Sequence, residues 1–70
     1  MWVLLDQDQD GKDVYFKGWS DYTPLTTSDI REAHMFDSKR DAKFSQAYRH
    51  RQSNFVPVEV EIVVVKSKAA

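Results

Sequence analysis

Cysteine is absent from this chain of 70 residues, and glycine and proline occur only twice each. Without thiols the protein can form neither disulfides nor thiolate metal sites, and this composition suits a reducing cytoplasm. Apolar runs such as the one from Ile62 to Val65 are far shorter than the roughly 20 residues of a membrane-spanning helix. Two glycines also cannot build a glycine-rich phosphate loop. We therefore expect a cytoplasmic protein that has no membrane span and no cofactor.

Catalytic motifs are missing as well. His34 and His50 stand apart, without the His-x-x-x-His or His-Glu-x-x-His spacing of a metal centre. The serines lie in no nucleophile elbow, and helix caps or turns account for most of them. The sequence therefore predicts no catalytic residues and a protein that is not an enzyme.

Charge is divided unevenly along the chain, although the net charge is only −1. Residues 1–37 carry eight acidic and three basic side chains, which gives −5, whereas residues 38–54 carry five basic and one acidic side chain, which gives +4. Residues 55–70 are neutral in sum. This separation predicts a dipolar molecule, with its negative end at the N-terminal part and its positive end at residues 38–54.

The segment from Asp6 to Asp13 begins like an EF-hand calcium loop. Asp6, Asp8 and Asp10 alternate before a glycine, as in the first half of that pattern. Lys17, however, occupies the twelfth position, where a bidentate glutamate should close the cage. Three interpretations stay open: a plain hairpin turn, a weak cation site that uses Asp6, Asp8 and Asp10, and an acidic surface for a basic partner. We favour the hairpin turn and predict no dedicated metal site.

Strands should flank this loop. Residues 2–5 and 13–19 are rich in β-branched and aromatic side chains, which predicts a β-hairpin. From Ser20 to Thr27 the chain combines turn-forming residues and Pro24 with apolar ones, which predicts an ordered connection.

Helical patterns follow the hairpin. Thr27 or Ser28 should cap a short helical turn that ends near His34, after which Met35 and Phe36 enter the core. The main helix should begin at Asp37 or Ser38 and run to about Gln52. We expect one stripe of it to contain Phe44, Ala47, Tyr48 and Arg51.

The last element is a strand from Val56 to Ile62, whose side chains alternate between apolar and polar. Val56, Val58, Val60, Ile62 and Val64 should share one of its faces. The fold class is therefore α+β: a three-stranded antiparallel sheet, in the order ββ(α)αβ, with one main helix packed on one face. Residues 1–70 form a single domain, and residues 66–70 are expected to be a frayed tail. The last strand could pair with the first and leave the second at an edge, but local patterns do not decide the strand order.

Two groups of residues are candidates for binding. The main helix carries basic side chains that could form a solvated face, contact phosphates or contact an acidic protein: Lys39, Arg40, Lys43, Arg49 and Arg51. Aromatic residues concentrate at the second strand and the loop after it, and exposed ones are favoured interface anchors: Tyr15, Phe16, Trp19 and Tyr22, with Trp2 opposite. A core interpretation stays open for the second group, in which Trp2, Phe16 and Phe36 pack with Val58 and Val60.

Three stretches resemble small proteins of bacteriophages and prophages: Tyr15 to Trp19 (YFKGW), Thr26 to Ala33 (TTSDIREA) and Phe36 to Ala42 (FDSKRDA). The likeness covers about residues 14–45. The strand-strand-helix-strand plan is also similar to phage-encoded inhibitors of host enzymes and to anti-defence proteins, including anti-CRISPR proteins. The resemblance implies a protein that acts in the cytoplasm of an infected or lysogenic host cell, and it implies no particular binding residue.

Our leading hypothesis is a non-enzymatic binding protein that masks a surface of another protein, such as a host nucleic-acid-processing or defence factor. The expected partner-binding residues are Trp19 and Tyr22 as anchors, with Arg40, Lys43 and Arg49 as steering charges. The alternative is a nucleic-acid-binding accessory protein that uses the basic helix 38–52. A homodimer could accompany either function, formed through Val63, Val65 and an exposed sheet edge.

Overall fold

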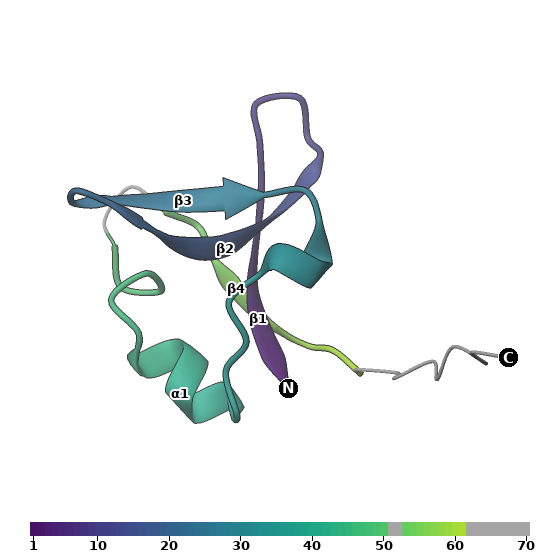
Figure 1. Ribbon diagram of the computed structural model, residues 1–70, viewed down its shortest axis with the longest axis vertical. Coiled ribbons are helices and arrows are strands. Elements are labelled where there is room, and N and C mark those ends of the chain that lie inside the picture. The colour runs from purple at the N-terminus through teal and green to yellow at the C-terminus, as the bar shows by residue number, and fades with distance from the viewer. Residues whose placement is uncertain (51–52, 62–70) are drawn as a thin grey trace, which may run out of the picture.

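The computed structural model describes residues 1–50 and 53–61. Its elements are β1 (Trp2–Gln7), β2 (Asp13–Ser20), β3 (Thr23–Thr27), the 3-10 turn η1 (Ile30–Glu32), α1 (Lys39–Phe44) and β4 (Val56–Glu59) (Figure 1). The strands form one antiparallel sheet in the order β3-β2-β1-β4. The predicted α+β class with an antiparallel sheet is confirmed, but the sheet has four strands rather than three.

The hairpin around the acidic loop forms as predicted. β1 and β2 pair from Leu5 opposite Tyr15 to Gln7 opposite Asp13, and the loop between them makes the tip that stands clear of the other elements in Figure 1. Gly11 has a φ of +78°, a conformation that costs glycine little because it has no Cβ.

The extra strand, β3, lies in the segment that we expected to be a connection. Asp21 and Tyr22 form a tight turn, and Asp21 adopts a φ of 54°, which Asp tolerates better than most residues. Beyond this turn the chain pairs back onto β2, with Ser20 opposite Thr23, and the register shifts once near Lys17. Pro24 argued against a strand here, because proline cannot donate a hydrogen bond within a sheet. It is tolerated because β3 is an edge strand.

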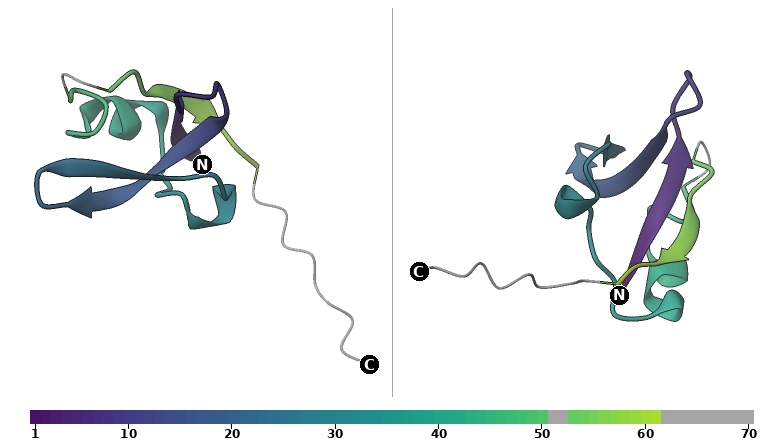
Figure 2. Two further views of the ribbon diagram at one scale, coloured as in Figure 1. Left: turned by 90° about the horizontal axis from the view of Figure 1, so that it is seen from above. Right: turned by 90° about the vertical axis from the view of Figure 1, so that its right-hand side faces the viewer.

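β4 pairs with β1, as the sequence allowed, but β2 does not become an edge strand because β3 covers it. The β2–β3 hairpin crosses β1 and β4 at a steep angle, and it lies in a different layer from α1 (Figures 1 and 2). The segment after η1 runs beside the start of β1, where Trp2 and Phe36 exchange two backbone hydrogen bonds of 2.8 and 2.7 Å.

The core lies where α1 and the turns after it meet β1, β2 and the residue before β4. Its buried members come from five separate parts of the chain: Leu4, Phe16, Ala42, Ala47 and Phe55. Trp2, Phe36 and Tyr48 are half-buried and pack against this cluster. The expected contribution of Phe16 is therefore confirmed, whereas Val58 and Val60 are only half-buried.

The main helix is much shorter than predicted. It starts where expected, because the Ser38 hydroxyl caps it by accepting from the Asp41 amide at 3.1 Å. It ends at Phe44 rather than near Gln52, because the Ser45 hydroxyl donates to the Ala42 carbonyl at 2.7 Å and accepts from the Tyr48 amide at 3.2 Å. Such local bonds compete with helical ones and convert residues 46–49 into turns.

Two expected apolar faces are also wrong in part. Phe44 is 62% exposed instead of lying in a buried stripe with Ala47, because the helix ends between them. Val56 is 57% exposed instead of facing the core with Val58. The other predicted members of these faces, Arg51, Ile62 and Val64, lie outside the described residues, as does the tail 66–70.

Candidate surface for a binding partner

Two of the aspartates at the β1–β2 hairpin, Asp6 and Asp8, accept hydrogen bonds from backbone amides. One oxygen of the Asp8 carboxylate, Oδ1, accepts from the Asp10 amide at 2.9 Å and from the Lys12 amide at 3.0 Å. Asp6 Oδ1 accepts from the Gln7 amide at 2.7 Å. Within residues 1–50 and 53–61, no three His, Asp or Glu side chains are grouped in a way that could hold a metal ion. These contacts are those of a hairpin turn in which the Asp6 and Asp8 carboxylates accept hydrogen bonds from backbone amides.

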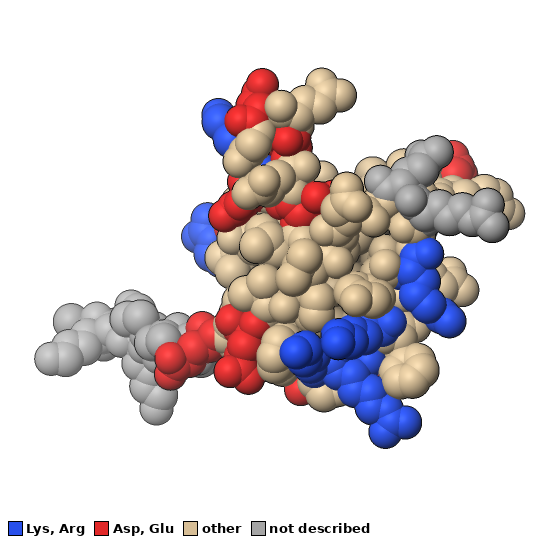
Figure 3. Space-filling view, turned by 180° about the vertical axis from the view of Figure 1, so that it is seen from behind, with Lys and Arg blue, Asp and Glu red and all other residues tan. Residues whose placement is uncertain are grey.

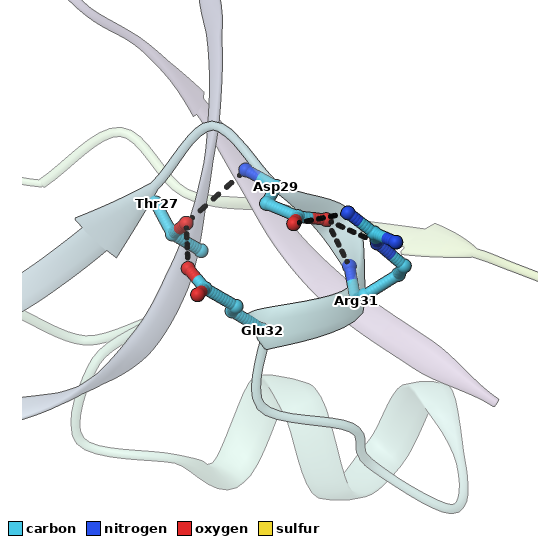
Figure 4. Close-up of polar contacts among 4 residues, drawn as sticks. All are labelled: Thr27, Asp29, Arg31 and Glu32. Atoms are coloured by element: carbon cyan, nitrogen blue, oxygen red, sulfur yellow. Dashed lines mark hydrogen bonds and ion pairs between the residues drawn. The ribbon is translucent and has the colours of Figure 1, made fainter.

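A second polar cluster joins β3 to η1 and has an equally structural explanation (Figure 4). The Asp29 carboxylate accepts from the Arg31 amide at 3.0 Å and pairs with the Arg31 guanidinium at 3.0 and 2.9 Å. The Thr27 hydroxyl accepts from the Asp29 amide at 3.1 Å and donates to the Glu32 carboxylate at 2.9 Å.

The hydrogen bonds from the Arg31 side chain and amide lower the pKa of Asp29 from its ordinary value. The same pairing raises the pKa of Arg31. Both pKa shifts favour the ionised forms of the two side chains. The cluster therefore stabilises the turn, and neither group has a pKa moved toward neutral pH as a general acid or base requires.

Two predicted anchor residues, Trp19 and Tyr22, lie at the turn end of the β2–β3 hairpin. Tyr22 is 93% exposed and Trp19 is 41% exposed. They line a shallow open depression together with Asp21, Gln46 and His50. The Trp19 and His50 rings are 6.0 Å apart between centroids, so the turns after α1 support one side of the tryptophan.

The basic residues gather around an exposed ring on α1. Lys39, Arg40, Lys43 and Phe44 line an open depression. The Arg40 guanidinium lies 5.4 Å from the centroid of the Phe44 ring, within the range of a cation–π contact. Lys39 lies in turn 5.8 Å from the Trp2 ring. Figure 3 shows that Lys and Arg gather mainly on one side of the molecule, away from the acidic groups at the hairpin tip.

The segment 45–50 connects these two groups of residues. Its Arg49 donates from Nη2 to the carbonyl oxygen of Phe44 at 3.4 Å, so this cation folds back onto the end of α1. In Figure 1 the β2–β3 turn and α1 lie toward the same end of the molecule at different heights, and the segment 45–50 runs between them. We call the resulting surface the aromatic-cationic face, formed by Trp19, Tyr22, Arg40, Lys43, Phe44 and Arg49.

Sequence reasoning missed one member of this face, Phe44, because a helix continuing to residue 52 would have buried its ring. Gln46 and His50 were also missed as neighbours of Trp19. The only indication in the sequence was Ser45, which can end a helix by bonding to the backbone.

The fold and this surface define a small α+β domain that exposes aromatic and cationic side chains together. A scan against protein-family models, a search of curated proteins and a search of solved structures each find no match. In the described part of the chain, no helix has the length and apolar character needed to cross a membrane.

Proposed function

We propose that the protein is a non-enzymatic binding protein that masks a surface of another protein through its aromatic-cationic face. The main support is that exposed anchor and charge lie on connected segments: the β2–β3 turn presents Tyr22, and the segment 45–50 lies between this turn and the cations of α1. Aromatic residues and arginine are the residue types that contribute most often to interface affinity.

The exposure of Tyr22 has no explanation in folding. Its side chain is 93% exposed, and it follows Asp21, whose positive φ is uncommon for a residue with a side chain. A tyrosine that contributes nothing to the core gives a partner a large, rigid contact at a small cost in conformational entropy. The turn therefore suits a role as an anchor that enters a partner's pocket.

The charges suit electrostatic guidance of such an encounter. Asp and Glu dominate the hairpin tip, whereas Lys and Arg dominate the side of α1 (Figure 3). A dipolar domain with a net charge near zero orients as it approaches an acidic surface, rather than binding every acidic surface equally. The resemblance to phage proteins suggests a host nucleic-acid-processing or defence factor as the target, and cytoplasm as the place of action.

Site-specific photo-crosslinking in bacterial cells tests this proposal. A photo-reactive phenylalanine analogue replaces Tyr22 in a tagged copy, and the matched control carries it at Gln9, which is exposed at the acidic hairpin tip. We expect one defined covalent adduct with a host protein from position 22, its loss in the double variant Arg40→Glu and Lys43→Glu, and no such adduct from position 9. Identical adduct patterns from both positions, or none from position 22, would contradict the proposal.

Nucleic acid is the alternative partner, and the basic residues of α1 are what supports it. Tyr48, the aromatic residue nearest these cations in the segment after α1, is half-buried against the core, so less of its ring is available for stacking on bases. An oligonucleotide whose binding weakens steeply with salt and is lost on Arg40→Ala and Lys43→Ala would favour this alternative.

A further inference from the structure

We infer that the depression on α1 binds an acidic peptide segment that carries a large apolar side chain, and that this side chain packs on Phe44. The inference rests on the proposed function and names the chemistry of the partner at one part of the aromatic-cationic face. It follows from an exposed aromatic ring and from cations that have no ion-pair partner among the described residues, all around one depression.

The apolar part of the site is the exposed ring of Phe44. Phe44 is 62% exposed although it ends the helix that covers the core, and the buried residue of that helix is Ala42. The core is complete without the ring, because Ala42, Ala47 and Phe55 already close it against Leu4 and Phe16. An exposed ring of this size favours contact with an apolar group, since covering it removes apolar surface from water.

The charged part of the site is the set of cations around the Phe44 ring. Lys39, Arg40 and Lys43 all line the same depression. Within residues 1–50 and 53–61 the only ion pair joins Arg31 to Asp29, so none of these cations is neutralised by a described carboxylate. Arg40 lies over the ring at 5.4 Å, and this contact holds charge and apolar surface next to each other. Carboxylates placed on either side of an apolar side chain would complement this arrangement.

The dimensions favour a peptide over other ligands. The depression is open and lies on a helix of six residues, so it cannot enclose a small molecule as ligand pockets usually do. A helix of six residues is about 9 Å long, at about 1.5 Å per residue, which is short compared with the groove that follows a nucleic acid strand. The acidic hairpin and the net charge of −1 add repulsion for a long polyanion.

An NMR titration of the isotope-labelled protein with two synthetic peptides tests the inference. Both peptides carry the same glutamates and aspartates, and they differ only at one central position, which is phenylalanine in the probe and serine in its control. We expect amide shifts centred on residues 39–44 with the probe, and affinity at least about tenfold lower for the serine peptide. Added salt should weaken both complexes, because the cations are exposed.

Variants of the protein test the apolar contact and the charge contact separately. Phe44→Ser should reduce the affinity for the probe peptide to that for the control peptide, and Lys43→Glu should lower the affinity for both peptides about fivefold. Thr26→Ser, an exposed change on β3, serves as the matched control and should alter neither. Because Phe44 and Lys43 are exposed, the far-UV circular dichroism of these variants should match the parent's.

Several results would overturn the inference. Equal affinity for the two peptides would show that no apolar side chain of the peptide packs on Phe44. Amide shifts centred outside α1 would show that the peptide binds elsewhere on the protein. Tighter binding of a single-stranded oligonucleotide at the same residues would assign the depression to nucleic acid. Self-association that Lys43→Glu abolishes would assign it to a second copy of the chain. If the two peptides bind equally while the adduct from position 22 still forms, the proposed function survives and only this inference fails.

Discussion

Replacing Leu4 by alanine should remove a large fraction of the stability of this protein. Leu4 is fully buried in β1 and belongs to the core cluster. Leu4→Ala deletes about three apolar carbons, a transfer cost of about 2.4 kcal/mol at about 0.8 kcal/mol each. The neighbours cannot close the gap, because Ala42 and Ala47 are short and the Phe16 and Phe55 rings are held edge to face at 5.8 Å. A remaining cavity raises the expected loss to about 3 kcal/mol, within the range of about 2–5 kcal/mol for such changes.

This loss is large for a domain of 70 residues, whose total stability is expected to be about 3.5–10.5 kcal/mol at about 0.05–0.15 kcal/mol per residue. At about 4–8 °C per kcal/mol, the melting temperature should fall by about 12–24 °C. Urea denaturation followed by tryptophan fluorescence measures the free energy of unfolding directly, because Trp2 packs on the core.

Leu25→Ala is the matched control for Leu4→Ala. Leu25 lies on the edge strand β3 with 37% of its surface exposed, so water and mobile side chains can fill the space that its truncation leaves. We expect a loss of about 1 kcal/mol and no change in the denaturant slope. Equal losses at Leu4 and Leu25 would refute the placement of Leu4 in the core and of Leu25 at its periphery.

Three smaller predictions concern the turns and caps. Asp8→Ala should lower the free energy of unfolding by about 0.5–1 kcal/mol, because the Asp10 and Lys12 amides lose an acceptor, while millimolar calcium should leave the amide shifts of residues 6–13 of the parent protein unchanged. Ser38→Ala should cost about 1 kcal/mol in urea denaturation and Ser38→Asp should cost little, since aspartate also caps helices. The pKa of Asp29 is lowered by Arg31, so its contribution to stability is present at neutral pH and is lost as the pH falls through the folded-state pKa. The stability gap between the parent and Asp29→Asn should therefore shrink as the pH falls below the ordinary pKa of an aspartate, and a gap that widens there would contradict the pairing.

The hairpin, the helix start and the α+β class could be predicted because local chemistry determines them. Asp10-Gly11 between two β-rich runs and Ser38 three residues before Asp41 act within a few residues of their own position. The pairing of β4 with β1 was one of two open alternatives, because the register between distant strands depends on contacts that local patterns do not contain.

The errors came from tertiary packing at β3 and Phe55, and from a local hydrogen-bond pattern at the end of α1. Pro24 argued against a strand in the middle of a sheet, but the edge position of β3 makes its missing N–H harmless. Helical periodicity grouped Phe44 with Ala47, yet the serine between them ends the helix and turns the ring outward. Phe55 precedes the alternating run of the last strand, and its burial follows only from the distant position of Phe16. The aromatic-cationic face depends on these same features, so its residue types could be anticipated from the sequence but its shape could not.

The edges of the sheet also bear on the proposed mode of binding. Val60 donates to the Met1 carbonyl at 2.8 Å, so by the alternation of an antiparallel pair the nitrogen atoms of Pro57 and Glu59 face the open side of β4. Proline at one of these positions removes a donor, and a glutamate occupies the next. Pro24 likewise lies on β3, the other edge strand. Prolines and charges of this kind discourage a second chain from adding to a sheet.

Val63 and Val65, the other residues expected in a homodimer, lie outside the described residues, so the described edges weigh against edge-to-edge pairing. A partner would then be recognised by side chains rather than by added strands, which is the mode of contact that the exposed rings and cations beside α1 suit.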